Sequence, residues 1–492
     1  MAPGQFHKPY MRLDVISDVY EGSDAVGLAH LIKSKQVSAA ELVEESIARI
    51  EEKNPKVNAV VFKTYDHARK RAAGPLAQTP LSGVPFVIKD LSTQYEGFPV
   101  TNGSKLFKDA PTGPNSFFAD RMAAAGLIAV GKSNLPEFGL CPTTEPRLHG
   151  AAVNPWNPRI VPGGSSGGSA VAVAAGMVPI ADASDGGGSI RIPSSVNGLV
   201  GLKVSRGRVP FGPGAVDTWY GMGVLGCVSR SVRDTAAFLD AVGGSLPGDP
   251  YFLPMPGTPY FSMLGGPVDR LRIGFVTAEP DGKPLDGDVA KAVIKATQLC
   301  RDLGHNVVEK SFRYDVSALH TTMRRLTSAL TKAIFESCEG FLGRKVTQDD
   351  VEPLTWAIAE FGGQFTAAQH AADLEKLRQF GREIVLGLDD VDVLIAPTLP
   401  TLPKPPGYFD MSLTDVGEYD RRSGPNAVFT RPFNVSGQPS LNLPLHVASD
   451  NIPVGVQFIG RIGDEATLLK LGDQIEKMSP WMDRLRQTPF RV

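Results

Sequence analysis

The sequence predicts an α/β fold in which helices cover both faces of a central sheet. Short apolar runs typical of buried strands alternate with amphipathic helical patterns along most of the 492 residues. Apolar residues make up 42% of the chain and charged residues 21%, so a large core can form. The length suggests about three domains or one large α/β domain.

Two helices are expected to open the fold. Ser23 can cap the first of them. Ser38 and Glu41 form a capping box for the second, which should end at 54–55 because proline does not continue a helix. The apolar run at 57–62 then predicts a strand.

Strands and helices alternate through the rest of the chain. Strand-like runs occur at 84–88, 127–130, 178–183, 199–204, 271–276, 306–309, 391–396, 441–445 and 454–459. Helical patterns occur at 116–125, 167–175, 231–242, 288–303, 316–388 and 464–477. Gly126 ends one of these helices, and Ser231 with Asp234 can cap another. The order of the elements predicts a three-layer architecture.

Composition excludes several classes of function. A net charge of −2 gives no reason to expect nucleic acid or an anionic membrane as a partner. The four cysteines are too scattered for a disulfide framework or a zinc site, and reduced thiols indicate a cytoplasmic protein. Residues 1–13 lack the apolar segment of a secretory signal, and no His-Glu-x-x-His motif is present. We therefore expect no metal and no other cofactor.

Two loops rich in glycine and serine, at 162–169 and 185–193, stand out from this pattern. Ordering glycine costs more backbone entropy than ordering any other residue, so such loops indicate a close approach of the backbone to a ligand. In the second loop, the N–H groups of Gly186, Gly187 and Gly188 can converge on one point before Ser189, as an oxyanion hole requires. A tight turn that merely happens to be glycine-rich remains an equal alternative.

The serines allow two catalytic schemes. Ser165 lies in a Gly-x-Ser-x-Gly pattern typical of the nucleophile of α/β-hydrolases, but that scheme needs a later histidine. Only His446 follows late enough, within a run that indicates a core strand. Lys89 follows the buried strand at 84–88, where it is either a surface lysine or a desolvated neutral base. A serine–lysine pair needs no histidine. Neither loop has the lysine spacing of a phosphate-binding loop.

Eight segments together carry a family resemblance. They are VIKD at 87–90, GKSN at 131–134, NPWN at 154–157, GGSSGGS at 163–169, GGSIRIP at 187–193, GLVGLK at 198–203, PFNVSGQP at 432–439 and PVGVQ at 453–457. In this order they resemble the amidase signature family, and the resemblance covers nearly the whole chain. It implies an α/β/α fold with a mixed central sheet, and hydrolysis of amide C–N bonds.

The resemblance also implies a Ser–cisSer–Lys triad. Ser189 would be the nucleophile, Ser165 the bridging serine after a cis peptide bond from Gly164, and Lys89 the base. The N–H groups from Gly186 to Ser189 would bind the oxyanion. Leu140 and Thr144 lie in a run that borders the acyl pocket in this family, and Tyr220 would lie at its entrance. Leu140 in the core and Tyr220 in ordinary packing are the alternatives.

The family resemblance, together with the order of the elements, also predicts a domain layout. We expect one domain over 1–492, with a catalytic core at 60–245 and a smaller, more helical region over the substrate at 246–400. The chain then returns to the core sheet at 401–492. A proline- and glycine-rich stretch at 243–266 separates the first two parts.

Two further segments indicate the substrate class. TTEP at 143–146 and SRSVRD at 229–234 resemble bacterial amide hydrolases of the 6-aminohexanoate cyclic-dimer hydrolase type. Ile192 and the serines at 194–195 depart from the amidotransferase A subunit. The expected partner is therefore a small-molecule amide or carbamate, and the features leave open a homo-oligomer. An amidotransferase subunit, an esterase or urethanase, and a catalytically silent protein are the alternatives.

Overall fold

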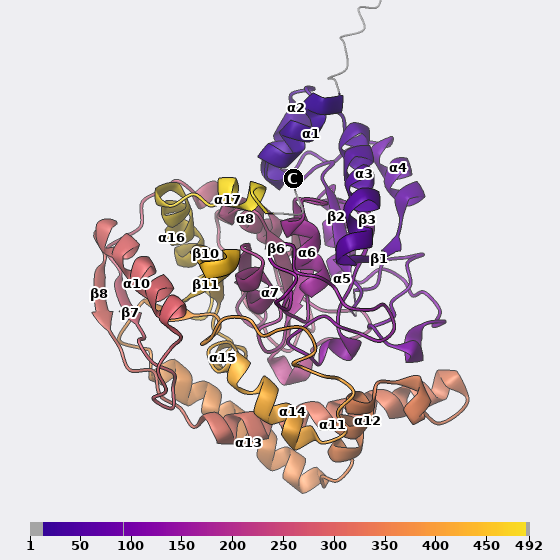
Figure 1. Cartoon of the computed structure of the whole chain (residues 1–492), viewed down its shortest axis with the longest axis vertical. Helices are drawn as coiled ribbons and strands as arrows, with labels where there is room; N and C mark the ends of the chain where they lie inside the picture. Colours follow the sequence, from indigo (N-terminus) through magenta and orange to yellow (C-terminus); the bar gives the residue numbers. More distant parts are fainter. Residues whose placement is uncertain (1–12, 92, 489–492) are drawn as a thin grey trace, which may run out of the picture.

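The computed structural model describes residues 13–91 and 93–488, so most of the N-terminal segment considered above lies outside the described residues. Its centre is one mixed sheet of eleven strands (Figure 1). In spatial order these are β1 (Val60–Lys63), β3 (Ile128–Ser133), β2 (Pro85–Lys89), β4 (Ile180–Asp185), β6 (Val224–Ser229), β5 (Val200–Lys203), β10 (Ser440–Ala448), β11 (Ile452–Ile459), β9 (Val393–Pro397), β7 (Arg272–Phe275) and β8 (Asn306–Glu309). The expected α/β fold with a mixed sheet is confirmed.

The strands bury side chains on both faces. In β2, Phe86 and Ile88 join one apolar cluster and Val87 joins another, as alternation along a strand requires. Helices α2 (Ala25–Lys33), α5 (Phe117–Ala124), α8 (Val232–Val242), α9 (Tyr260–Met263), α10 (Gly287–Asp302) and α16 (Glu465–Met478) contribute to the first cluster. Helices α3 (Ala39–Val57), α4 (Tyr65–Ala72) and α6 (Gly167–Ala174) contribute to the second. These two sets of helices form the outer layers, and the apolar clusters lie between them and the sheet.

A further group of helices lies beyond the sheet, along the bottom of Figure 1. It contains α11 (Val316–Leu342), α12 (Pro353–Gly362), α13 (Ala367–Leu386) and α14 (Val416–Ser423). Two short helices, α7 (Arg191–Val196) and α15 (Arg431–Ser436), lie nearer the sheet. Helices α11 and α13 share an apolar cluster with β9 and with residues of α15. This cluster joins the group to the face of the sheet that α10 does not cover.

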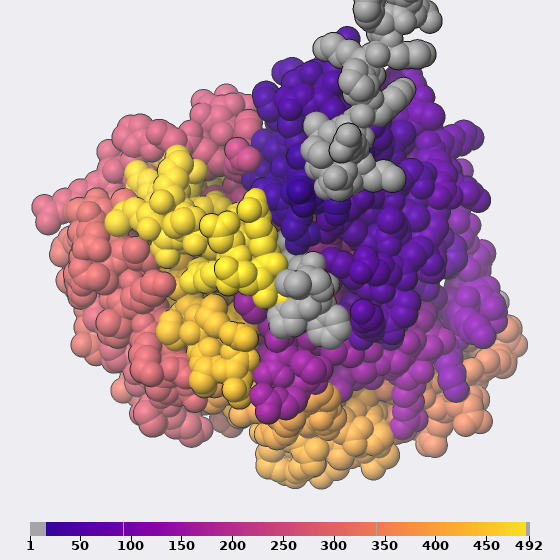
Figure 2. All heavy atoms as spheres, turned by 45° about the horizontal axis from the view of Figure 1, so that its top comes forward, coloured from indigo at the N-terminus to yellow at the C-terminus, as the bar shows by residue number. Residues whose placement is uncertain are grey.

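The two ends of the described chain pack together. Helix α1 (Leu13–Gly22) contacts α17 (Met482–Arg486), and the Arg486 guanidinium donates to the carbonyl oxygen of Gly22 at 2.8 Å. Figure 2 shows the C-terminal residues, in yellow, beside the N-terminal residues, in indigo. Among the described residues, no helix is both long and apolar enough to cross a membrane.

Three helices rather than two open the fold. The cap of α2 is Asp24, not Ser23, because the Asp24 carboxylate accepts from the N–H of Gly27. Helix α3 continues to Val57 with Pro55 inside it, and it ends where Asn58 adopts a left-handed conformation. Pro55 has no backbone N–H to donate to the preceding turn, so the helix lacks one hydrogen bond there and ends two residues later.

Several elements escaped the sequence prediction, among them one central strand and one polar helix. Strand β6 lies between β4 and β5 in the centre of the sheet, and α4 follows β1. Helix α4 is strongly polar and only Ala68 in it is buried, so its apolar pattern is weak. The expected helical stretch at 316–388 is divided into α11, α12 and α13.

Candidate active site

Lys89 is the last residue of β2, and Asp185 is the last residue of β4. The two strands are parallel neighbours, with Val87 opposite Ala181. Their carboxyl ends therefore meet at the same edge of the sheet, where α/β proteins commonly place their sites. The Lys89 side chain is 1% exposed, and its Nζ lies 2.8 Å from Ser165 Oγ and 2.9 Å from Ser184 Oγ.

The surroundings of Lys89 favour its neutral form. Burial lowers the pKa of Lys89 to about 7, although the charges of Asp182 and Asp185 raise it. The Asp182 carboxylate accepts the backbone N–H of Lys89 at 3.1 Å, and burial raises the pKa of Asp182. A surface lysine, the alternative considered for this position, is excluded. The amine instead titrates near neutral pH beside a serine hydroxyl.

Ser165 is held by a close approach of several backbones. The peptide bond between Gly164 and Ser165 is cis, as the family resemblance implies. A Cβ atom at Gly164 would lie 2.6 Å from the carbonyl oxygen of Thr143, closer than real Cβ contacts allow. Gly139 has a φ of +68°, and a Cβ atom there would lie 3.2 Å from Ser165 Oγ. Glycine is therefore required at Gly164 and favoured at Gly139.

Ser189 is half-buried on the loop between β4 and α7. Its carbonyl oxygen accepts the N–H of Ser166 at 3.3 Å, which joins the two glycine-rich loops. Within the described part of the chain, Ser189 Oγ forms no hydrogen bond with Ser165. The structure thus brings Ser165 and Lys89 into direct contact and places Ser189 on the adjoining loop. Catalytic hydrogen bonds often close only when substrate is bound.

The oxyanion donors predicted from the sequence need one correction. The N–H of Gly188 donates to Asp185 Oδ1 at 2.8 Å, so this group is already engaged. The N–H groups of Gly186, Gly187 and Ser189 have no hydrogen-bond partner among residues 13–91 and 93–488. Three free donors of this kind can still stabilise an oxyanion.

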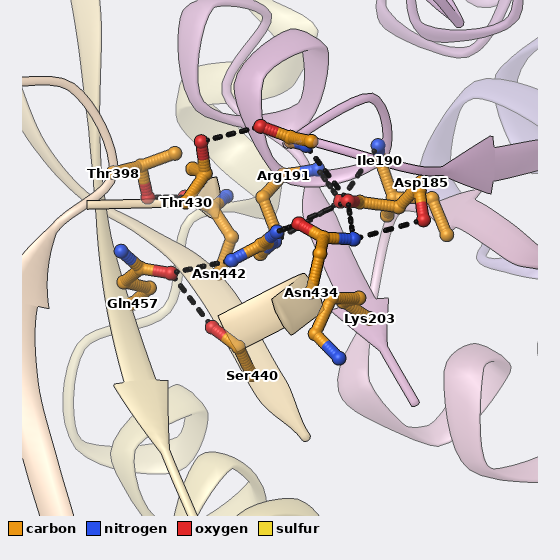
Figure 3. Close-up of polar contacts among 12 residues, drawn as sticks. Asp185, Ile190, Arg191, Lys203, Thr398, Thr430, Asn434, Ser440, Asn442 and Gln457 are labelled. Carbon is orange, nitrogen blue, oxygen red and sulfur yellow. Dashed lines mark hydrogen bonds and ion pairs between the residues drawn. The ribbon is translucent and has the colours of Figure 1, made fainter. Parts of the chain in front are cut away.

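A buried ion pair holds this loop (Figure 3). Arg191 Nε donates to Asp185 Oδ2 and Nη2 to Asp185 Oδ1, each at 3.0 Å. Asn434 Nδ2 donates to the backbone and side-chain oxygens of Asp185, and Asn434 Oδ1 accepts from Arg191 at 2.7 Å. Burial alone would raise the pKa of Asp185, but Arg191 and Asn434 hold it below its usual range. Asp185 therefore stays ionised and fixes the start of the loop.

Residues from the distant C-terminal part complete this support. Gln457 Oε1 accepts from Arg191 at 3.2 Å, and Thr430 Oγ1 donates to the carbonyl oxygen of Gly187 at 2.7 Å. The segments at 432–439 and 453–457 are part of the sequence resemblance, but only their folding against Asp185 shows what Asn434 and Gln457 contact.

A cavity opens beside Ser189. Its lining includes Gly187, Ser189, Leu140, Ile192 and Trp219. Three side chains from the helical group, His320, Arg324 and Met323, also line it, as does Arg431. No sequence pattern indicated the charged members of this set, because they come from helices with ordinary charge patterns.

The three expected pocket residues have different positions. Leu140 lines the cavity. Thr144 does not, because it is 0% exposed and its Oγ1 donates to the carbonyl oxygen of Gly163. A Cβ atom at Gly167 would lie 2.2 Å from Thr144 Oγ1, so Thr144 fills space beside the first glycine loop. Tyr220 is absent from the lining found within the described chain, and its ring packs against His370 with centroids 5.4 Å apart.

The alternative that uses His446 gains no support. His446 lies in β10 and is only partly buried. The charges that act on it are those of Asp288, Lys291 and Lys295 on α10 and of Arg484 on α17, none of them in a glycine loop. No group of three or more His, Cys, Asp or Glu residues in the described ranges could hold a metal ion. The contact between Lys89 and Ser165 brings an amine and a hydroxyl together at the site.

Comparisons with known proteins agree with this geometry. The amidase family model matches residues 41–469. The 6-aminohexanoate-cyclic-dimer hydrolase of Paenarthrobacter ureafaciens is 36% identical over 485 residues, which cover 94% of this chain and 96% of that protein. A structure of 6-aminohexanoate cyclic dimer hydrolase complexed with substrate superimposes with a TM-score of 0.91 at 35% identity, covering 96% of this chain and all of that one.

A second solved structure widens the comparison. A bacterial aryl acylamidase of the amidase signature family superimposes with a TM-score of 0.85 at 29% identity, covering 96% of this chain and 99% of the other. Sequence, fold and the arrangement around Lys89 therefore lead to the same assignment. The chain belongs to the amidase family and is an amide hydrolase.

Proposed function

We propose that the chain hydrolyses carboxylic amides through an acyl-enzyme on Ser189, with Ser165 as the proton bridge and Lys89 as the base. The observation that carries this proposal is the buried Lys89 amine, which lies 2.8 Å from Ser165 Oγ and has a pKa of about 7. Because a neutral amine has a free lone pair, it can accept a proton from a hydroxyl.

The first half-reaction transfers one proton along this relay. Ser189 Oγ attacks the carbonyl carbon as its proton passes to Ser165, while Ser165 passes its own proton to Lys89. The carbonyl oxygen becomes an oxyanion, which the free N–H groups of Gly186, Gly187 and Ser189 would stabilise. Removing one such donor typically costs about 10²–10³ in rate.

Collapse of the tetrahedral intermediate breaks the C–N bond. The proton held by Lys89 returns through Ser165 to the leaving nitrogen, which departs as a neutral amine. A water molecule then attacks the acyl-enzyme, its proton follows the same path, and the acid is released with Ser189 restored. Every proton taken up by Lys89 is returned, so no cofactor is consumed.

The substrate class is the second part of the proposal. The relatives include hydrolases of a cyclic amide and of aryl amides. Leu140, Ile192 and Met323 give the cavity apolar walls, which suits an alkyl or aryl acyl group. We therefore propose cyclic or linear amides as substrates. Aryl carbamates and esters react by the same steps, and an amidotransferase subunit would show activity only with its partners.

A fluorophosphonate probe tests the nucleophile. We expect peptide mass mapping to find the label on Ser189, with labelling abolished by Ser189→Ala. Ser194→Ala is a matched control, because Ser194 is buried on the same segment and contacts the carbonyl oxygen of Val200. A label on Ser165 would instead support the nucleophile pattern of α/β-hydrolases. A panel of anilides, lactams, fatty amides and aryl carbamates, assayed with the isolated chain, tests the substrate class.

A further inference from the structure

The cavity beside Ser189 contains an arginine that the proposed mechanism does not use. Arg431 begins α15 and lines the cavity together with Ser189. Its Cγ lies 3.6 Å from the position that a Cβ atom would take at Gly187, so the side chain runs along the loop that carries the nucleophile. A group bound by this guanidinium would be close to the reacting carbonyl.

The other arginine that lines the cavity, Arg324, is neutralised by Asp420. Arg324 Nε and Nη2 donate to Asp420 Oδ1 at 2.9 and 2.7 Å. His320 lies between this pair and Arg431, with Nε2 at 3.2 Å from Asp420 Oδ1 and Nδ1 at 3.4 Å from Arg431 Nη1. Burial, followed by the charge of Arg431, lowers the pKa of His320, so the imidazole is neutral near pH 7.

Arg431 is left without a counter-ion. In the described part of the chain, no carboxylate forms an ion pair with its guanidinium, and Asp420 is already bound by Arg324. The remaining titratable neighbours do not compensate, because burial raises the pKa of the Cys141 thiol to about 12 and raises that of the Tyr314 phenol well above its usual range, so both groups are neutral near pH 7. The cavity therefore carries one net positive charge. A desolvated charge of this kind is costly unless it is paired.

We propose that Arg431 binds a carboxylate of the substrate, so that the preferred substrates are amides that carry a carboxylate on an apolar chain. A guanidinium can donate two parallel hydrogen bonds to a carboxylate, which gives strength and orientation. Leu140, Ile192 and Met323 line the same cavity and would contact the chain between the carboxylate and the scissile amide. This inference rests on the proposed role of Ser189 as the reacting centre. A neutral carbonyl is the competing occupant.

The first test compares three anilides that differ only at one end. Monoanilides of C4 to C6 dicarboxylic acids carry a carboxylate, their terminal carboxamides carry a neutral carbonyl, and the matching alkyl anilides carry a methyl group. Aniline release gives kcat/KM for each. A second series places the carboxylate on the amine part instead. We expect the carboxylate to be preferred in one of the two series.

The variants then assign that preference. Arg431→Met should lower the ratio of kcat/KM between carboxylate and carboxamide substrates by about 10–100-fold, mainly through KM. Arg421→Met is the matched control, because it removes an arginine that is 67% exposed and paired with Glu418. Its ratio should equal that of the wild type. If Arg431→Met does not fold, Arg431→Lys should lower the ratio partly, because lysine lacks the bidentate geometry.

A binding measurement separates this inference from the mechanism. Calorimetry with Ser189→Ala should show that adipate or glutarate binds, and that adding Arg431→Met weakens binding by about 10–100-fold. This readout does not depend on turnover, so it stands even if another serine is the nucleophile. Equal kcat/KM for carboxylate and carboxamide, preference for the carboxamide, or an unchanged ratio in Arg431→Met would each overturn the proposal.

Discussion

Lowering the pH through neutrality should switch the enzyme off by protonating Lys89. The pKa of this buried amine is about 7, and only the neutral form can accept the proton of Ser165. Below pH 7 the neutral fraction falls about tenfold for each pH unit, so kcat/KM at pH 5 should be about 100-fold below its plateau. If Lys89 kept the ordinary lysine pKa of 10.5, kcat/KM would already fall as the pH dropped below 10.5.

The assay is a profile of kcat/KM against pH with an uncharged anilide, because kcat/KM reports the ionisation of the free enzyme. Lys89→Met removes the base and should abolish the acid limb together with most of the activity. General-base catalysis typically contributes about 10²–10⁴ in rate, which sets the size of the loss. A flat profile between pH 5 and 8 in the wild type would refute the reasoning, as would full activity in Lys89→Met.

Replacing Asp182 tests whether neighbouring charge contributes to the pKa of Lys89. Its carboxylate raises the pKa of Lys89, in opposition to the effect of burial. Replacing it by asparagine removes the charge while keeping an acceptor for the backbone N–H of Lys89. The acid limb should then move to lower pH. A shift to higher pH would show that Asp182 does not act on Lys89 through its charge.

Two further predictions concern the support of the loops. Arg191→Met leaves the buried Asp185 carboxylate without its cation and should destabilise the protein by about 3–5 kcal/mol in denaturant unfolding, whereas the exposed Arg159→Met should change stability by less than about 0.5 kcal/mol. Thr144→Val loses the hydrogen bond to Gly163 and should cost about 1 kcal/mol of stability with KM unchanged. A raised KM with unaltered stability would show that Thr144 contacts the substrate after all.

Several corrections have a common physical origin. The sequence places Thr144 in a pocket-lining run, but the missing side chain of Gly167 leaves space that Thr144 fills. The N–H of Gly188 could serve an oxyanion by its position in the chain, yet the Asp185 carboxylate binds it first. In each case a polar group that is adjacent in sequence to the site finds a partner within the protein. Pattern alone does not reveal such partners.

The sequence by itself determined the α/β fold, the family and the pairing of Lys89 with Ser165, because a glycine-rich loop and a lysine at a strand end need particular backbone and side-chain chemistry. Parallel pairing of β2 and β4 then brings Lys89 beside Ser184 and the first loop. Only the tertiary structure decided the electrostatics. The pKa of Lys89 depends on burial and on Asp182, and the unpaired charge of Arg431 depends on Asp420 being bound by Arg324 from another helix. Desolvation and charge pairing are properties of three-dimensional neighbours, which no local pattern contains.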